Sequence, residues 1–266
     1  MKKKLFALLL SVLCMGTLAG CGAKSDSDYD YITSNGKMII GITEYEPMNY
    51  YDEDGNLTGF DTEFAEMVCE KLGVTPEFQI IDWEMKETVL KAQNIDCIWN
   101  GLTVTEERRE NMDFSDTYLA NRQCIVINAE DAETYTDTAS LSGALLTAEA
   151  GSAGETAILS DENLSQASYT ASTSQADALL GLKAGNYDAI VIDYTLANAS
   201  VGTGDYTDMV ILEDVRLADE LYAIGFRVGS DMTDKVNAII AEMKADGSLA
   251  ALAEKYELTE LYESVE

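Results

Sequence analysis

The chain contains 266 residues, enough for one or two domains of about 150 residues each. Hydrophobic residues make up 47% and charged residues 24%, a composition that excludes a disordered, collagen-like or disulfide-scaffold protein. The formal charge of -31 predicts repulsion from phosphate backbones, so no nucleic-acid partner is expected. The chain has no histidine, which removes the commonest transition-metal ligand and the usual general base, and we predict no metal and no other cofactor.

The first twenty residues have the layout of a secretion signal. Three lysines precede an apolar run that is too short to span a bilayer, and small residues follow it. The segment Leu18-Ala19-Gly20-Cys21 resembles the bacterial lipobox, in which the cysteine receives a lipid before cleavage. The alternative is an ordinary signal that happens to precede a cysteine. We predict a lipoprotein signal peptide over residues 1–20, lipid attachment at Cys21 and anchorage at the extracytoplasmic face of the cell membrane.

A tether and a first α/β unit are predicted next. Residues 21–35 have little periodic apolar content and are predicted to be flexible. Strands and helices then alternate, with Asp61 as the expected cap of the first helix and Gly73 as its end. The expected elements are a strand over 37–42, a helix over 60–72, a strand over 77–81, a helix over 84–92 and a strand over 95–99. This order predicts a parallel sheet.

A second unit and a C-terminal return complete the chain. The expected elements are strands over 144–148, 167–169 and 187–192, helices from 152 and over 174–183, a strand-like run over 221–228 and helices over 231–245 and 249–256. Residues 257–266 are predicted to be a frayed acidic tail. We predict two lobes joined by two crossings: lobe 1 over 36–121, lobe 2 over 122–217, and the second hinge with the rest of lobe 1 over 218–266.

Three cysteines remain besides Cys21. Cys69, Cys97 and Cys124 each lie in an apolar-periodic context, so we expect small buried hydrophobic side chains. A single disulfide among them is the alternative, and their spacing does not match a zinc site.

Polar residues follow the predicted strands, at the sheet edge where open α/β folds bind ligands. Ser152 and Glu155 form a capping-box pattern, and the small residues between them leave first-turn N–H groups accessible to a carboxylate. Arg108 offers a planar fork of donors that matches a carboxylate, and Asp193 offers a carboxylate at a strand end. Together they match a zwitterion, although an ordinary capped helix, a surface ion pair and a helix cap also explain these residues separately.

Ordered motifs over residues 36–257 resemble the extracytoplasmic solute-binding proteins of polar amino-acid ABC transporters, bacterial solute-binding protein family 3. The motifs are Gly55-Asn56-Leu57-Thr58-Gly59-Phe60-Asp61, Ile95-Asp96 leading to Gly101-Leu102-Thr103-Val104-Thr105-Glu106-Glu107-Arg108, Asp113-Phe114-Ser115, Tyr187-Asp188-Ala189 leading to Asp193, and Tyr222-Ala223-Ile224-Gly225-Phe226 through Asp246-Gly247-Ser248. The resemblance implies the type 2 periplasmic-binding-protein fold, with two α/β lobes joined by two hinge strands.

The resemblance also implies which residues bind the ligand. Those that hold its α-carboxylate are Arg108, Thr103 and the N–H groups around Ser152 and Ala153. Those that hold its α-ammonium group are Asp193 and the carbonyl of Gly101. Those that usually face its side chain are Tyr45 and Trp83, which would sandwich it, and Asn100 and Glu149.

Two departures from the family pattern affect these assignments. The loop over 43–47 is one residue shorter than in many members and lacks their aspartate, which puts Glu44 in doubt as a ligand contact. Position 149 is often neutral in relatives. Glu149 therefore either selects a cationic side chain or bonds an amide or hydroxyl group.

The resemblance predicts a monomeric binding protein, not an enzyme. Its lobes close on a polar or cationic amino acid, and the closed form delivers that ligand to an ABC-transporter permease. One alternative is a lyase of the cyclohexadienyl dehydratase type, with Glu149 or Glu44 as general acid. The other alternative is a ligand-sensing receptor of the same fold.

Overall fold

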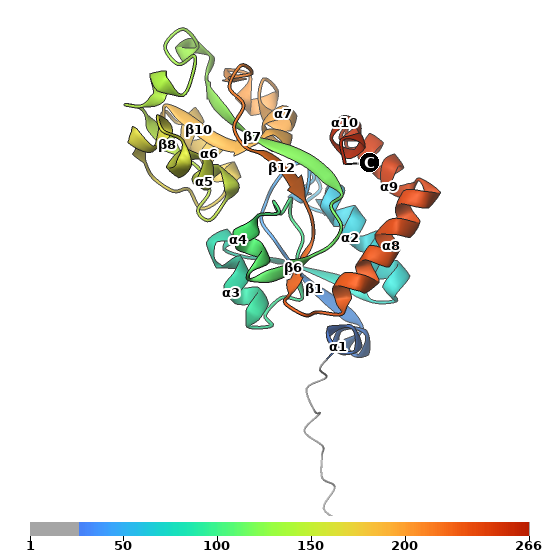
Figure 1. The fold of residues 1–266 in the computed structure, drawn as a ribbon. Coiled ribbons are helices and arrows are strands. Elements are labelled where there is room, and N and C mark those ends of the chain that lie inside the picture. The colour runs from blue at the N-terminus through green and yellow to red at the C-terminus, as the bar shows by residue number, and fades with distance from the viewer. Residues whose placement is uncertain (1–26, 266) are drawn as a thin grey trace, which may run out of the picture.

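The computed structural model describes residues 27–265, which form two α/β lobes connected by strands that cross between them (Figure 1). The predicted signal peptide over 1–20, the predicted lipid site Cys21 and the start of the predicted tether lie outside the described residues, as does residue 266. Two lobes with one main sheet each agree with the predicted fold class.

The sheet of the first lobe has the strand order β4, β1, β5, β13, β6. The strands are β1 Lys37–Ile42, β4 Thr75–Ile80, β5 Cys97–Ile98, β6 Met112–Phe114 and β13 Gly225–Arg227. Strands β4, β1 and β5 are parallel, as predicted, whereas β13 is antiparallel to both of its neighbours. The sheet is mixed because β13 belongs to the C-terminal segment, which enters from the other lobe and runs in the opposite direction.

Strand β1 contributes side chains to hydrophobic cores on both faces of this sheet. Met38, Ile40 and Ile42 belong to one core, while Ile39 packs against the other. Burial on both faces explains the nearly continuous apolar run from which this strand was predicted. The first core includes residues of helices α2 Phe60–Leu72, α8 Met232–Asp246 and α9 Ser248–Lys255, and the second includes residues of the 3-10 helix η1 Trp83–Met85 and of α3 Lys86–Lys91.

The sheet of the second lobe has the order β11, β7, β10, β8, β9. Its strands are β7 Leu119–Asn128, β8 Leu145–Thr147, β9 Ser168–Tyr169, β10 Ala189–Asp193 and β11 Met209–Ile211. Strand β10 is parallel to β8 and antiparallel to β7. The helices are α5 Ala153–Ser160, α6 Gln175–Lys183 and α7 Tyr194–Ser200.

Two antiparallel strands connect the lobes. Strand β7 pairs with β12 Asp219–Tyr222 at its start, in a register that places Asp219 opposite Arg122 and Tyr222 opposite Leu119. The rest of β7 continues into the sheet of the second lobe, so one strand belongs to both the connection and the lobe (Figure 1).

Shorter elements complete the described chain. They are the hairpin of β2 Tyr50–Tyr51 and β3 Leu57–Thr58, helix α4 Glu106–Arg109, and the 3-10 helices η2 Ala129–Asp131, η3 Ala139–Leu141, η4 Leu164–Gln166 and η5 Gly204–Tyr206.

The predicted tether is wrong for its C-terminal half, where the structure has helix α1 Asp28–Asn35. Ile32 of this helix is fully buried, and the Asp28 carboxylate lies 2.9 Å from an Nη of Arg227. The Asp231 carboxylate accepts hydrogen bonds from the Ser27 hydroxyl and the Tyr29 N–H. A single buried isoleucine leaves almost no periodic signal, so this helix depends on contacts with a distant part of the chain.

The predicted frayed tail is also wrong, because it contains helix α10 Thr259–Glu263, in which Tyr262 is buried.

A third difference concerns Asp61, which was expected to cap the first helix. Helix α2 has Gly59 at its N-cap and no side-chain capping bond. The Asp61 carboxylate instead accepts hydrogen bonds from the Gly101 N–H at 2.7 Å and the Tyr118 hydroxyl at 3.0 Å, which ties the start of α2 to the site loop.

The three cysteines of the described chain are free and fully buried, as predicted, and the disulfide alternative is not formed. Burial raises the pKa of the Cys69 thiol to about 12, so it remains protonated and unreactive at neutral pH.

Candidate functional site

A small cavity lies between the lobes, at the carboxyl ends of β4, β5, β8 and β10. Its volume is about 10 Å³, close to the space of one water molecule. Nine of the ten predicted site residues line it: Trp83, Asn100, Gly101, Thr103 and Arg108 from the first lobe, and Glu149, Ser152, Ala153 and Asp193 from the second. Gln175, which the sequence analysis missed, also lines it. The structure therefore brings together residues that are far apart in sequence.

Arg108 lies on helix α4, which begins where the Thr105 hydroxyl accepts a hydrogen bond from the Arg108 N–H. The guanidinium is buried and donates to the carbonyls of Thr103, at 2.7 Å, and Gly151, at 3.1 Å. Burial lowers the pKa of Arg108, although an arginine remains charged. Two of its five N–H groups are used in these bonds, so it retains donors for a carboxylate.

Asp193 ends strand β10 and has only neutral hydrogen-bond donors. The side-chain amides of Gln123 and Gln175 donate to its carboxylate, and the amide of Asn121 does so at 3.0 Å. Burial raises the pKa of Asp193. Asn121 and Gln123 were not predicted, but their spacing is visible in the sequence: they lie two residues apart at the start of a mostly apolar strand, so their side chains share one face.

Glu149 follows strand β8 and has an unpaired carboxylate oxygen. Its side chain is only 2% exposed, and Oε1 has no hydrogen-bond partner among the described residues. Burial and the nearby Asp193 charge raise the pKa of Glu149 to about 8, against the opposing effect of Lys86 and Arg108. An unpaired buried acceptor is costly, and a ligand donor at this position would relieve that cost.

Lys86 was not predicted, yet it lies next to the site. Its ammonium donates to the carbonyls of Trp83, at 3.1 Å, and Gly151, at 2.8 Å, and lies 5.0 Å from the centre of the Trp83 ring. Burial lowers the pKa of Lys86 to about 8. Because Arg108 also donates to the Gly151 carbonyl, two cations of the first lobe hold one carbonyl of the second.

Tyr45 is the one predicted site residue that does not line the cavity. Its buried hydroxyl is hydrogen-bonded to Tyr222, at 2.6 Å, and to Thr195. The Tyr45 ring packs against Gly101, whose φ is +55° and where an added Cβ would lie 2.5 Å from a ring carbon. The predicted aromatic sandwich therefore has only Trp83 at the cavity.

Asn100 lines the cavity, but its amide is already fully used. The amide donates to the Thr43 carbonyl and to Asn49 Oδ1, and its oxygen accepts from the Thr43 N–H and hydroxyl. Side-chain contact with a ligand was predicted here. These four bonds instead indicate that Asn100 holds the loop after β1 in place.

The start of α5 has the predicted capping geometry. The Ser152 hydroxyl accepts from the Glu155 N–H at 3.1 Å, and the Glu155 carboxylate accepts from the Gly151 N–H at 2.7 Å. Gly154 is required for close packing, because an added Cβ would lie 2.7 Å from the Val191 carbonyl oxygen. The first-turn N–H groups beside Ala153 therefore reach the cavity edge on a tightly packed helix.

A larger groove of about 530 Å³ adjoins the cavity and shares Thr103, Arg108 and Ala153 with it. Six acidic residues line this groove: Glu84, Glu87, Glu107, Glu155, Asp219 and Glu220. Lys86 and Arg108 are its cationic lining residues. The groove borders the cavity, and its charge favours a positively charged solute.

Two α/β lobes joined by paired strands, with a buried arginine and a buried aspartate facing one inter-lobe cavity, define the class of two-lobe solute-binding proteins. The chain belongs to the bacterial extracellular solute-binding proteins, family 3, whose model matches residues 38–259. The predicted family and fold class are confirmed, and the chain is an extracytoplasmic solute-binding protein.

Individual relatives are similar along nearly their whole length. The arginine-binding extracellular protein ArtP of Bacillus subtilis strain 168 is 28% identical, with 96% of this chain and 98% of ArtP covered. The L-cystine-binding protein TcyJ of Escherichia coli K12 is 26% identical, with 93% and 94% covered. The crystal structure of the P235GK mutant of ArgBP from T. maritima has a TM-score of 0.80 and 29% identity, covering 86% of this chain and 98% of that one.

Among residues 27–265, no helix has the length and apolar character needed to cross a membrane.

Proposed function

We propose that the protein captures an amino acid with a cationic side chain outside the cell and delivers it to an ABC-transporter permease. The observation that carries this proposal is the placement of Arg108 and Asp193 on opposite sides of one inter-lobe cavity. The free N–H groups of Arg108 suit the α-carboxylate, and Asp193 suits the α-ammonium group. Relatives named for arginine and for cystine support an amino-acid ligand.

Two observations favour a cationic side chain. Glu149 Oε1 is buried at the cavity without a partner, and it would accept a hydrogen bond from a guanidinium or ammonium group. The adjoining groove has six acidic residues, and the whole chain carries a formal charge of -31. Both the entrance and the end of the path therefore attract positive charge.

Ligand entry requires the lobes to separate. A cavity of about 10 Å³ has room for one water molecule, whereas an amino acid is many times larger. The bonds from Lys86 and Arg108 to the Gly151 carbonyl, and from Tyr45 to Thr195, connect the lobes in the closed arrangement. An amino acid that contacts both lobes would shift the equilibrium toward closure.

The test of this function is thermal unfolding of the purified protein with each of the twenty amino acids, ornithine and cystine. A ligand at 100 times its dissociation constant adds about 2.7 kcal/mol to the free energy of unfolding. We expect stabilisation by arginine, lysine or ornithine, and its loss in Arg108→Ala and Asp193→Ala. The neighbouring and more exposed Arg109→Ala is the control. If arginine, lysine and ornithine all fail to stabilise the protein, the proposal is contradicted.

Membrane anchorage through a lipid on Cys21 is part of the same proposal, as are the monomeric state and the permease partner. A tethered receptor stays near its permease without being lost from the cell surface. Detergent partitioning tests the anchor: the wild-type protein is expected in the detergent phase and Cys21→Ser in the aqueous phase. Equal partitioning of the two would contradict lipid attachment.

The lyase alternative has one supporting observation, since burial raises the pKa of Glu149 to about 8 and a neutral carboxyl can act as a general acid. Incubation with a cyclohexadienyl acid separates the two functions. We expect no turnover, because the site offers Glu149 as a ligand contact. Turnover that is lost in Glu149→Gln would replace the binding proposal by the lyase.

A further inference from the structure

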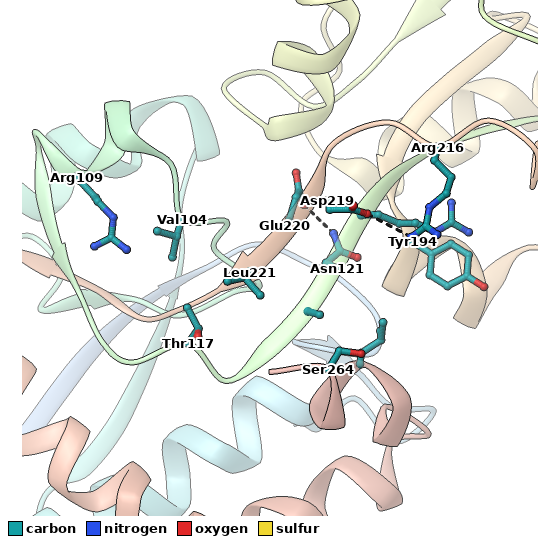
Figure 2. A pocket seen from close by; sticks show the side chains of 13 residues that line it. Val104, Arg109, Thr117, Asn121, Tyr194, Arg216, Asp219, Glu220, Leu221 and Ser264 are labelled. Atoms are coloured by element: carbon teal, nitrogen blue, oxygen red, sulfur yellow. Dashed lines mark hydrogen bonds and ion pairs between the residues drawn. The ribbon is translucent and has the colours of Figure 1, made fainter. Parts of the chain in front are cut away.

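Two buried carboxylates lie side by side where the second lobe joins the connecting strands. Asn121 and Gln123 project from the same face of β7, where Asn121 is opposite Glu220 of β12 and Gln123 is opposite Asp193 of β10. The two acidic residues therefore approach the same pair of amides from neighbouring strands. Figure 2 shows Glu220 and Asn121 on the two connecting strands, directed toward one another.

Both carboxylates share the same hydrogen-bond donors. The Asn121 amide donates to Asp193 at 3.0 Å and to Glu220 at 2.8 Å. The Gln123 amide donates to Asp193 and, at 3.1 Å, to both oxygens of Glu220. The remaining donors are also neutral: the Gln175 amide bonds Asp193, and the Thr103 hydroxyl bonds Glu220 at 3.2 Å.

No described lysine or arginine is paired directly with these two carboxylates. Within residues 27–265, neither Asp193 nor Glu220 forms an ion pair with a lysine or arginine. Arg108 acts on the pair through its charge, but its described hydrogen bonds go to the carbonyls of Thr103 and Gly151. Two carboxylates that share neutral donors in a buried site repel one another when both are ionised, so one of them retains a proton.

We propose that Glu220 is a positioning residue for ligand binding: in the free protein, Asp193 and Glu220 share one proton, and the α-ammonium group of the ligand expels it. The proton passes from the carboxyl pair to solvent, and the ammonium group then donates its hydrogen bonds to the ionised Asp193. This inference rests on the proposed function, because it requires a ligand with an ammonium group. It adds Glu220, which lines the adjoining groove and not the cavity itself, to the residues that set the affinity.

The other titratable groups around the pair are compatible with a shared proton. The hydroxyls of Tyr45 and Tyr222 lie close enough to Asp193 to favour its ionised form, as does the charge of Arg108. Glu149 faces the pair from the second lobe and opposes ionisation, while Lys86 lies beyond Glu149. Burial raises the pKa of Asp193, and burial together with the Asp193 charge raises the pKa of Glu220.

The position of Glu220 links the proton to lobe closure. Glu220 lies on the connecting strand, and its carboxylate accepts from Thr103 of the first lobe, whereas Asp193 belongs to the second. The amides of Asn121, Gln123 and Gln175 belong to the connecting strand and the second lobe, so they hold the pair and its shared proton whether the lobes are open or closed. Closure on a ligand would therefore release the proton, whereas closure without a ligand would retain it.

The test counts protons by isothermal titration calorimetry with L-arginine in buffers of different ionisation enthalpy. Glu149→Gln is the parent protein, since a cationic side chain bound at Glu149 would release a proton of its own. We expect this parent to release about one proton at about pH 6, and Glu149→Gln/Glu220→Gln to release close to none. Glu149→Gln/Glu66→Gln, altered at a distant carboxylate, is the matched control and is expected to release the same number as the parent.

Three results overturn the proposal: no release by the parent, release retained when Glu220 is replaced, or release lost in the Glu66 control. Binding without release contradicts the shared proton but leaves the proposed function intact. If the wild-type protein binds no amino acid at all, the proposed function itself is contradicted.

A second measurement does not need a ligand. The infrared carbonyl band of protonated carboxyl groups in the free protein should decrease in both Glu220→Gln and Glu220→Leu, and an unchanged band in a folded variant rejects the proposal.

Discussion

Glu149 is a single residue whose environment distinguishes between classes of ligand. Its Oε1 atom is buried at the cavity without a hydrogen-bond partner. We expect Glu149→Gln to weaken binding of L-arginine by about tenfold to a hundredfold, because a hydrogen bond to a charged group contributes about 1.5–3 kcal/mol. Binding of L-glutamine should change much less. Calorimetry of both ligands measures the difference, with Glu107→Gln in the outer groove as the control.

An equal loss for both ligands would mean that Glu149 supports the fold of the site. A loss for glutamine alone would reverse the proposed preference, and Glu149 would then bond an amide group.

Asp61 makes a separate prediction about stability and pH. Burial raises its pKa from 3.8 to about 7, so the folded protein holds this proton over a pH range in which the unfolded chain has released it. Stability from this group is therefore fully present below about pH 4 and is lost as the pH rises toward 7. We expect Asp61→Asn to reduce the fall of the melting temperature between these pH values, because an amide oxygen still accepts from the Gly101 N–H and Tyr118 hydroxyl.

Thermal unfolding in a series of buffers measures this effect. Glu149 and Glu220 also have raised pKa values, so part of the slope is expected to persist. An Asp61→Asn slope as steep as that of the wild-type protein would contradict a protonated Asp61.

Helix α1 illustrates stabilisation at the scale of an element. Most of its residues are polar, and it is attached to the first lobe through buried Ile32 and the ion pair of Asp28 with Arg227. We expect Ile32→Ala to lower the free energy of unfolding by about 2–5 kcal/mol, since it removes a fully buried side chain. Ile80→Ala, at a site that is 54% exposed, is the matched control and should change stability by less than about 0.5 kcal/mol.

Chemical denaturation of the two variants decides this point. Equal stabilities would show that α1 separates from the lobe in solution, as the sequence alone predicted for a tether.

The strands and helices with strong local patterns were predicted well. Strand β1 has the predicted bounds, and helix α2 ends at Gly73, whose φ is +72°. The expected long helix over 84–92 is divided into η1 and α3. The segment of β7 was predicted only as a crossing between the lobes and not as a strand of the second sheet, because the polar Asn121, Arg122 and Gln123 interrupt its apolar run.

Lobe closure is the prediction that concerns the whole molecule. Hydrogen bonds from Lys86 and Arg108 to the Gly151 carbonyl connect the two lobes. We expect L-arginine to reduce the radius of gyration in small-angle scattering, because the ligand adds contacts to both lobes. An unchanged scattering profile at saturating ligand would contradict closure.

A substitution at Lys86 tests the same equilibrium between open and closed lobes. Lys86→Met removes one of the two bonds to the Gly151 carbonyl while keeping an apolar stem against Trp83. We expect the free protein to become more open and arginine affinity to fall severalfold, by about 1 kcal/mol. Lys91→Met on the same helix is the control for general effects of charge.

The sequence by itself determined the broad chemistry of this protein. The acidic charge, the alternating strands and helices, and the polar residues after the strands are local properties. Nine of ten predicted residues line one cavity because the carboxyl ends of parallel strands in both sheets face it. The hydrogen-bond partners within the site were decided only by the tertiary structure. Asn121 bonds Asp193 and Glu220 across 72 and 99 positions, and Tyr45 bonds Tyr222 across 177. A local pattern contains no information on such distant pairs, because each depends on which segments the two folded lobes place side by side.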